Sequence, residues 1–190
     1  MENKKYLPLK IVHSILLVAV LVLCIIAFAM NNKDTSVYGN NIVTIIASVF
    51  NIIALIFGAI YMLMGYTKKA APFYKLFALA LMVTSVFQIA LIMSNVIYPL
   101  FNSFLYLISL VGTTVLVIAK DLGKVKTYIT VFVLLICRLI LVLLVVVGLS
   151  NLGSASIGVL SAVVSDLLLA GTAAIMATGK YLDKAERGTK

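Results

Sequence analysis

Two charged residues lie inside long apolar stretches of the sequence, where charges are rare. Arg138 lies midway along the run 129–148, and Asp166 lies midway along the run 157–177. A charge at the centre of a lipid bilayer costs roughly 2.5–3.5 kcal/mol on insertion scales, so each residue needs a partner. Because a short link joins the two runs, they should be neighbours, and we expect Arg138 and Asp166 to face each other at one depth.

The pair has three possible roles, two functional and one structural. Charged residues within membrane spans are candidates for substrate binding, which makes Arg138 a candidate site for an anionic substrate. Asp166 is a candidate for relaying a proton, as carboxylates do in pumps and transporters. The third alternative is a structural ion pair that fixes the alignment of two helices and binds no ligand.

Small residues recur at every fourth position through Asp166, which predicts that this side chain faces protein rather than lipid. The stripe consists of Gly158, Ala162, Asp166, Ala170 and Ala174. Such a stripe allows another helix to approach closely.

Other polar side chains lie near the middle of apolar runs. Asn51 and Gln88 are the strongest further candidates for binding a solute or an ion, because an unpaired amide is costly to bury. The hydroxyl residues at similar positions are Thr84, Ser85, Thr113, Thr114, Ser161 and Ser165. They line a polar interior if the protein is a transporter; otherwise they form hydrogen bonds between helices, worth about 0.6 kcal/mol each.

Patterns typical of enzymes are absent from the sequence. There is no His-Glu-x-x-His motif and no phosphate-binding loop, and the single histidine, His13, cannot build a histidine-rich metal site. Cys24 and Cys137 fall inside apolar runs, where cysteine acts as a small apolar residue. We therefore expect no catalytic residue, no metal and no cofactor, and we expect His13 to be a polar group at the membrane surface.

The residues above are carried by apolar runs that are long enough to cross a membrane. The chain has 190 residues, of which 64% are hydrophobic and only 11% are charged. A spanning helix needs about 20 apolar residues. Six runs meet this length: 11–30, 42–64, 75–94, 100–119, 129–148 and 157–177. The sequence therefore predicts an all-α integral membrane bundle of six transmembrane helices in a single domain, 1–190.

Positive residues predict the orientation of this bundle. Of the 15 lysines and arginines, all except Lys33 and Arg138 fall on one side of the predicted membrane. Cytoplasmic loops carry such an excess, so we expect both termini in the cytoplasm. The net charge of +9 then comes from a rim of basic residues that faces the lipid headgroups. No nucleic-acid partner is expected. We expect interfacial tyrosines along the same rim, namely Tyr6, Tyr66, Tyr74, Tyr128 and Tyr181.

Similar sequences near the helix ends suggest three repeated helical hairpins. A similar triplet lies several residues before a lysine in three helices. The triplets are Phe57-Gly58-Ala59 before Lys68, Val111-Gly112-Thr113 before Lys120, and Ala170-Gly171-Thr172 before Lys180. The alternative is that apolar helices with similar ends resemble one another by chance.

Two hypotheses for function follow. In the first, the protein binds or transports a small solute or ion at a mid-membrane site of Arg138, Asp166, Gln88 and Asn51, alone or as the membrane subunit of a larger transporter. In the second, it is a scaffold or regulatory subunit that contacts other membrane subunits or further copies of itself. Both place the chain in a plasma membrane, and the lysine-rich sequence without a cleavable signal peptide favours a bacterial one.

Overall fold

Helices make up the regular structure of this protein. The computed structural model describes residues 6–31, 41–95, 99–118, 122–149 and 156–188, and within these ranges there is no strand. Six helices are long and apolar enough to cross a membrane. In chain order the elements are α1 (Leu7–Asn31), α2 (Asn41–Leu63), the short 3₁₀ helix η1 (Lys68–Ala70), α3 (Ala71–Asn95), α4 (Pro99–Ile118), α5 (Lys124–Leu149) and α6 (Ser156–Gly188).

The helices coincide with the predicted apolar runs to within a few residues at most ends. The main difference is α6, which continues to Gly188, well past the end of its apolar run. Pro72 and Pro99 lie in the first turns of α3 and α4, where the missing N–H of proline costs no helical hydrogen bond. Gly123, just before α5, has a φ of 73°, which glycine adopts without strain. The assignment of 1–190 to one domain remains a prediction.

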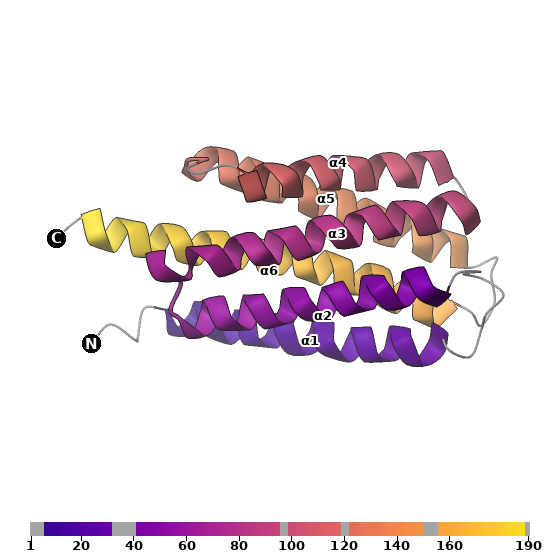
Figure 1. The fold of residues 1–190 in the computed structure, drawn as a ribbon, viewed down its shortest axis with the longest axis horizontal. Coiled ribbons are helices and arrows are strands. Elements are labelled where there is room, and N and C mark those ends of the chain that lie inside the picture. The colour runs from indigo at the N-terminus through magenta and orange to yellow at the C-terminus, as the bar shows by residue number, and fades with distance from the viewer. Residues whose placement is uncertain (1–5, 32–40, 96–98, 119–121, 150–155, 189–190) are drawn as a thin grey trace.

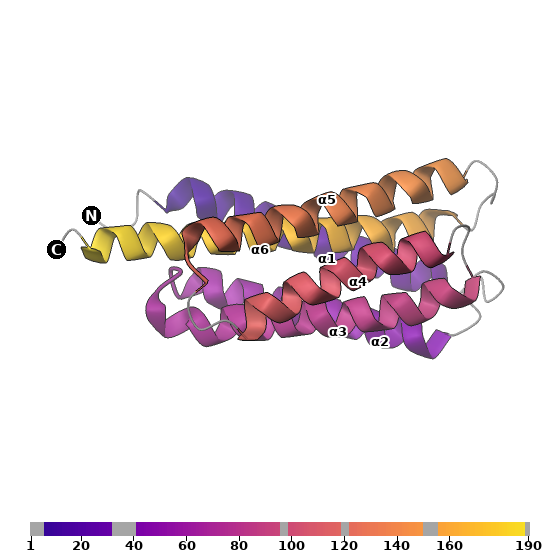
Figure 2. The same cartoon turned by 90° about the horizontal axis from the view of Figure 1, so that it is seen from above.

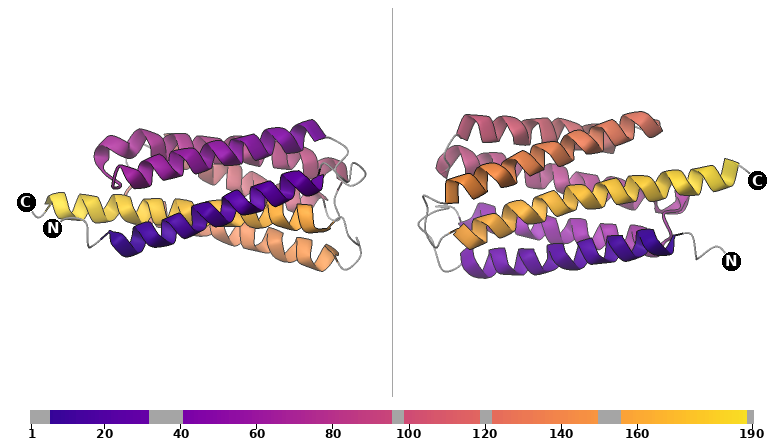
Figure 3. Two further views of the ribbon diagram at one scale, coloured as in Figure 1. Left: turned by 90° about the horizontal axis from the view of Figure 1, so that it is seen from below. Right: turned by 180° about the vertical axis from the view of Figure 1, so that it is seen from behind.

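The long helices form a ring in which each helix packs against the next one in the chain. α6 packs against α1, which closes the ring, and α6 also contacts α2 and α3 across the interior. Figures 1 and 2 show the helices aligned along the long axis of the molecule. α1 begins and α6 ends at the same end of the bundle, here called the terminal end, and the opposite end is called the far end (Figure 1). Figure 3 shows α1 and α6 side by side.

The outer surface of the ring is apolar. Large hydrophobic side chains are exposed on it, including Ile15 and Val18 of α1, Phe104 of α4 and Phe132 of α5. Such a surface would aggregate in water but is matched by the acyl chains of a bilayer. The fold is therefore that of a membrane-embedded helical protein.

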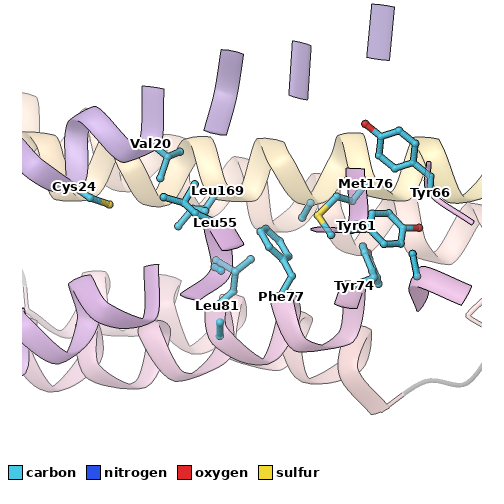
Figure 4. Close-up of a cluster of buried hydrophobic side chains, with 14 of the residues drawn as sticks. Val20, Cys24, Leu55, Tyr61, Tyr66, Tyr74, Phe77, Leu81, Leu169 and Met176 are labelled. Carbon is cyan, nitrogen blue, oxygen red and sulfur yellow. The ribbon is translucent and has the colours of Figure 1, made fainter. Parts of the chain in front are cut away.

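The largest hydrophobic cluster lies between α1, α2, α3 and α6. It contains large aromatic side chains together with Leu169 and Met176 of α6. Figure 4 shows Phe77, Tyr61, Tyr74 and Tyr66 grouped at one end of this cluster and Val20 and Cys24 at the other. The large side chains therefore gather toward the terminal end, where the link between α2 and α3 lies.

Candidate functional site

The two intramembrane charges meet inside the ring, as the sequence predicts. Nη1 of Arg138 on α5 lies 3.4 Å from Oδ2 of Asp166 on α6. Arg138 is only 4% exposed and Asp166 only 2%, so neither charge reaches the lipid-facing surface. Hydrogen bonds between a charged N–H and a carboxylate are usually about 2.7–2.9 Å, so this contact is long and involves one oxygen only.

Asn51 of α2 is the second predicted residue that the structure brings to this pair. Its Nδ2 donates a hydrogen bond to Oδ1 of Asp166 at 3.3 Å. Its Oδ1 accepts one from the hydroxyl of Thr84 at 3.1 Å, and this hydroxyl also lies 3.0 Å from the carbonyl of Ala80. The Asn51 amide is therefore oriented with its N–H toward the carboxylate and its oxygen toward α3.

Ser85 and Tyr106 complete the surroundings of Arg138. Nη2 of Arg138 donates to the Ser85 hydroxyl at 2.8 Å, and this hydroxyl in turn bonds to the carbonyl of Leu81 at 2.9 Å. The guanidinium carbon lies 4.3 Å from the centre of the Tyr106 ring, within range for a cation–π interaction. The Tyr106 hydroxyl donates to Oδ2 of Asp166 at 3.3 Å.

These residues form a buried polar cluster, here called the central cluster. It consists of Asn51 of α2, Thr84 and Ser85 of α3, Tyr106 of α4, Arg138 of α5 and Asp166 of α6. The five helices α2 to α6 each contribute to the central cluster, so the geometry of the cluster depends on how these helices pack. Its charges cancel, and all three contacts of the carboxylate are 3.3–3.4 Å long.

The remaining predicted polar residues play different parts. Gln88 lies on α3, and its side chain is outside the part of the structure that is described. Thr113 bonds to backbone carbonyls of its own helix, as does Ser165. Thr114 bonds to the carbonyl of Leu110 and to the sulfur of Met82. None of these bonds joins the central cluster.

Tyr106 is the member of the cluster that the sequence analysis missed. A tyrosine in an apolar run is usually read as an interfacial residue or as part of the core. The available signal was its position within the run 100–119, several residues inside the nearer end. A buried tyrosine hydroxyl needs a hydrogen-bond partner, which at this depth only another polar side chain can supply.

His13 and most of the tyrosines expected along the rim are buried in protein, and their depth in the membrane remains a prediction. His13 is fully buried, and its Nδ1 lies 3.0 Å from the Tyr66 hydroxyl. Tyr6 and Tyr74 are buried as well, and so is Tyr181, which bonds to Thr127 at 2.8 Å. On the long end of α6, Gly179 lies against the Tyr66 ring and Lys180 lies over the Tyr74 ring.

Tyr66 occupies a strained position in the link between α2 and α3. Its φ is 60°, a left-handed conformation that a bulky residue rarely adopts. The ring packs on Gly179 of α6 so closely that a Cβ at that position would overlap it. Burial raises the pKa of the Tyr66 phenol, so the hydroxyl stays protonated beside His13. The link is therefore fastened to both α1 and α6.

Among the described residues, no group of three His, Cys, Asp or Glu side chains comes together. Cys24 and Cys137 are both buried and are not joined in a disulfide.

Fold and site together define a helical membrane protein with a charged cluster in its interior. Comparison with known proteins adds nothing to this, since no family model, no curated protein and no solved structure matches the chain.

Proposed function

We propose that the protein binds a small anionic solute at Arg138, in the interior of the ring. It either carries the anion across the membrane itself or serves as the solute-binding membrane subunit of a larger transporter. Asp166 is the internal counter-ion of Arg138 in the state without solute. Asn51 and Gln88 are proposed as further members of the binding site.

The observation that carries this proposal is the long, one-oxygen contact between Arg138 and Asp166. A pair that served only to hold two helices together would be expected to have short, two-oxygen geometry. Instead the guanidinium has its shortest hydrogen bond with the neutral hydroxyl of Ser85, at 2.8 Å. A solute oxygen could replace Oδ2 of Asp166 and still find the Arg138 and Tyr106 donors in place.

Charge balance indicates what accompanies binding. Arg138 and Asp166 are neutral together, and an anion added beside them would leave one buried negative charge uncompensated. Buried unpaired charges are expensive, so Asp166 takes up a proton when the anion binds. The neutral carboxyl gives up its contacts with Arg138 and Tyr106 to the anion but keeps its hydrogen bond from Asn51, because the amide N–H can still donate to Oδ1. The anion and a proton are therefore bound together.

A thermal-unfolding screen tests this proposal. Purified protein in lipid nanodiscs is heated with chloride, nitrate, sulfate or methanesulfonate, whose charge does not change near neutral pH. An anion that binds the folded state adds RT ln(1 + [anion]/Kd) to the free energy of unfolding, so the unfolding temperature rises with the logarithm of the anion concentration above Kd. We expect at least one of these anions to do so for the native protein, in mildly acidic buffer, and none for Arg138→Gln. Equal responses from the two proteins would contradict the proposal.

A further inference from the structure

An apolar groove lies on the outer face of the ring, between α5 and α6. It has a volume of about 380 Å³ and is lined by Tyr128, Ile129, Val131, Phe132, Leu135 and Ala174. The small side chain of Ala174 on α6 lies beside two large and exposed ones on α5, Ile129 and Phe132. The Tyr128 hydroxyl donates to Thr178 of α6 at 3.1 Å and is therefore turned toward protein. The lining thus offers apolar contacts to whatever occupies the groove.

The groove runs along one half of the membrane thickness. α5 begins at the terminal end, as Figure 2 shows, and its first residue is Lys124. Tyr128 and Leu135 lie four and eleven residues after it. At 1.5 Å per residue these positions are roughly 6 and 16 Å along the helix, and the hydrocarbon core is about 30 Å thick. The groove therefore lies beside the acyl chains of one leaflet.

A basic turn leads into the groove at the terminal end. Lys124 and Lys126 are both exposed in the first turn of α5, which contains no acidic residue. The sequence 120–126 holds three lysines and one aspartate. Lys124 lies on the same face of the helix as Tyr128 and Leu135, because residues four and eleven positions apart are close to whole turns apart. An apolar groove that begins at a positive turn is complementary to an acyl chain that carries a negative headgroup.

We propose that this groove binds one anionic phospholipid, with an acyl chain along α5 and the phosphate beside Lys124 and Lys126. The lipid neutralises both lysines and covers the apolar lining at once. A second copy of the chain would do neither, because copies with one orientation in the membrane would bring the same basic turns together at one depth. Like charges that face each other across an interface repel. The proposal concerns the outer face of the ring and does not depend on the anion site at Arg138.

Tryptophan fluorescence tests the proposal, because the chain contains no tryptophan of its own. Phe132→Trp places a reporter in the wall of the groove, and Ile15→Trp places a matched control on the outer face of α1. Each of these residues lies eight positions after the start of its helix, and they are 63% and 61% exposed. Each protein is placed in vesicles that contain phosphatidylcholine and phosphatidylglycerol, and one of the two lipids carries a dibrominated acyl chain. Since bromine quenches only tryptophan in close contact, exchanging the brominated lipid gives the ratio of phosphatidylglycerol to phosphatidylcholine beside each reporter.

We expect this ratio to be at least about threefold higher for Phe132→Trp than for Ile15→Trp, since one lysine near an anionic lipid gives roughly a fivefold preference. Lys10 of α1 lies near the control position, so the comparison removes the general attraction of the basic rim for anionic lipid. Equal ratios at the two positions would overturn the proposal. Weak quenching of Phe132→Trp by both lipids would overturn it as well, because protein would then cover the groove.

Neutralised lysines identify the headgroup site. Lys124→Gln together with Lys126→Gln should lower the ratio at Phe132→Trp to that of the control. Lys68→Gln together with Lys69→Gln changes the charge equally at exposed positions of η1 and should leave the ratio unchanged. A preference for phosphatidylglycerol that survives the loss of Lys124 and Lys126 would contradict the proposed site.

A second pair of reporters keeps the test decisive if Phe132→Trp fails to fold. Ile129→Trp in the groove and Val12→Trp on α1 each lie five positions after the start of their helices, and both native residues are exposed. The higher ratio is expected for Ile129→Trp, and equal ratios would again overturn the proposal. Neither pair needs a bound solute, so this result stands or falls apart from the anion effect on unfolding.

Discussion

Arg138 and Asp166 meet through a single long contact, 3.4 Å from Nη1 to Oδ2, although both side chains are almost completely buried. Each charge also has a neutral partner, Ser85 for the guanidinium and Asn51 for the carboxylate. Each charge is thus hydrogen-bonded to a neutral group as well, but only the opposite charge neutralises it.

Removing one charge should be far more harmful than removing both. We expect Arg138→Leu or Asp166→Leu to lower the free energy of unfolding by about 3–5 kcal/mol, because a buried charge is left without its partner. The double variant should recover most of this loss. Unfolding temperatures in nanodiscs measure the effect, with Leu139→Ala, on the exposed face of α5, as the control. Additive losses in the double variant would refute the coupling of the pair.

Tyr106 should contribute through its hydroxyl and through its ring. Tyr106→Phe removes the hydrogen bond to Asp166 but keeps the ring beside Arg138. We expect it to cost about 0.6–1.7 kcal/mol, the average and the maximum measured for side-chain hydrogen bonds in a membrane protein. Tyr106→Leu should cost more, because the cation–π contact is lost as well. Equal unfolding temperatures for the two variants would show that the ring contributes nothing beyond its bulk.

Gly179 should be required for the packing of Tyr66 against α6. Gly179→Ala places a methyl group where the Tyr66 ring lies, and such overpacking typically costs about 1–3 kcal/mol. Gly171→Ala on the same helix is the matched control, because a Cβ there would lie 3.8 Å from Leu16, an ordinary contact distance. We expect a lower unfolding temperature for Gly179→Ala only. A loss of the same size in both variants would show that helix α6 tolerates no added methyl group, and that Tyr66 has no special role.

The pairing of Arg138 with Asp166 could be predicted from the sequence because the cost of a charge in hydrocarbon leaves few alternatives. That the Asn51 side chain points into the protein could be predicted in the same way, because an unpaired amide is also costly in hydrocarbon. Tyr106 could not be predicted, because a tyrosine is acceptable at an interface, in a core or in a polar site. The position of Tyr66 depends on the left-handed conformation of one link residue, which apolar periodicity does not encode.

The orientation in the membrane remains a prediction from the lysines and arginines. Cysteines introduced into the links 31–41 and 150–156 should react with impermeant reagents applied to intact cells. Cysteines placed at Lys68 or Lys124 should react only after the cells are opened. The opposite labelling pattern would place both termini outside.

The central claim is that Asp166 is a replaceable counter-ion of Arg138, and Asp166→Asn tests it most directly. The substitution keeps the shape of the side chain and removes its charge. The measurement is the apparent Kd of the anion, obtained from the unfolding temperature at a series of anion concentrations, in mildly acidic and in mildly alkaline buffer. For the native protein we expect anion binding to weaken as the pH rises, since Asp166 must take up a proton. Asp166→Asn should bind equally at both pH values, and more tightly than the native protein in alkaline buffer. An Asp166→Asn protein that responds to anions no more than the native protein does would contradict the account.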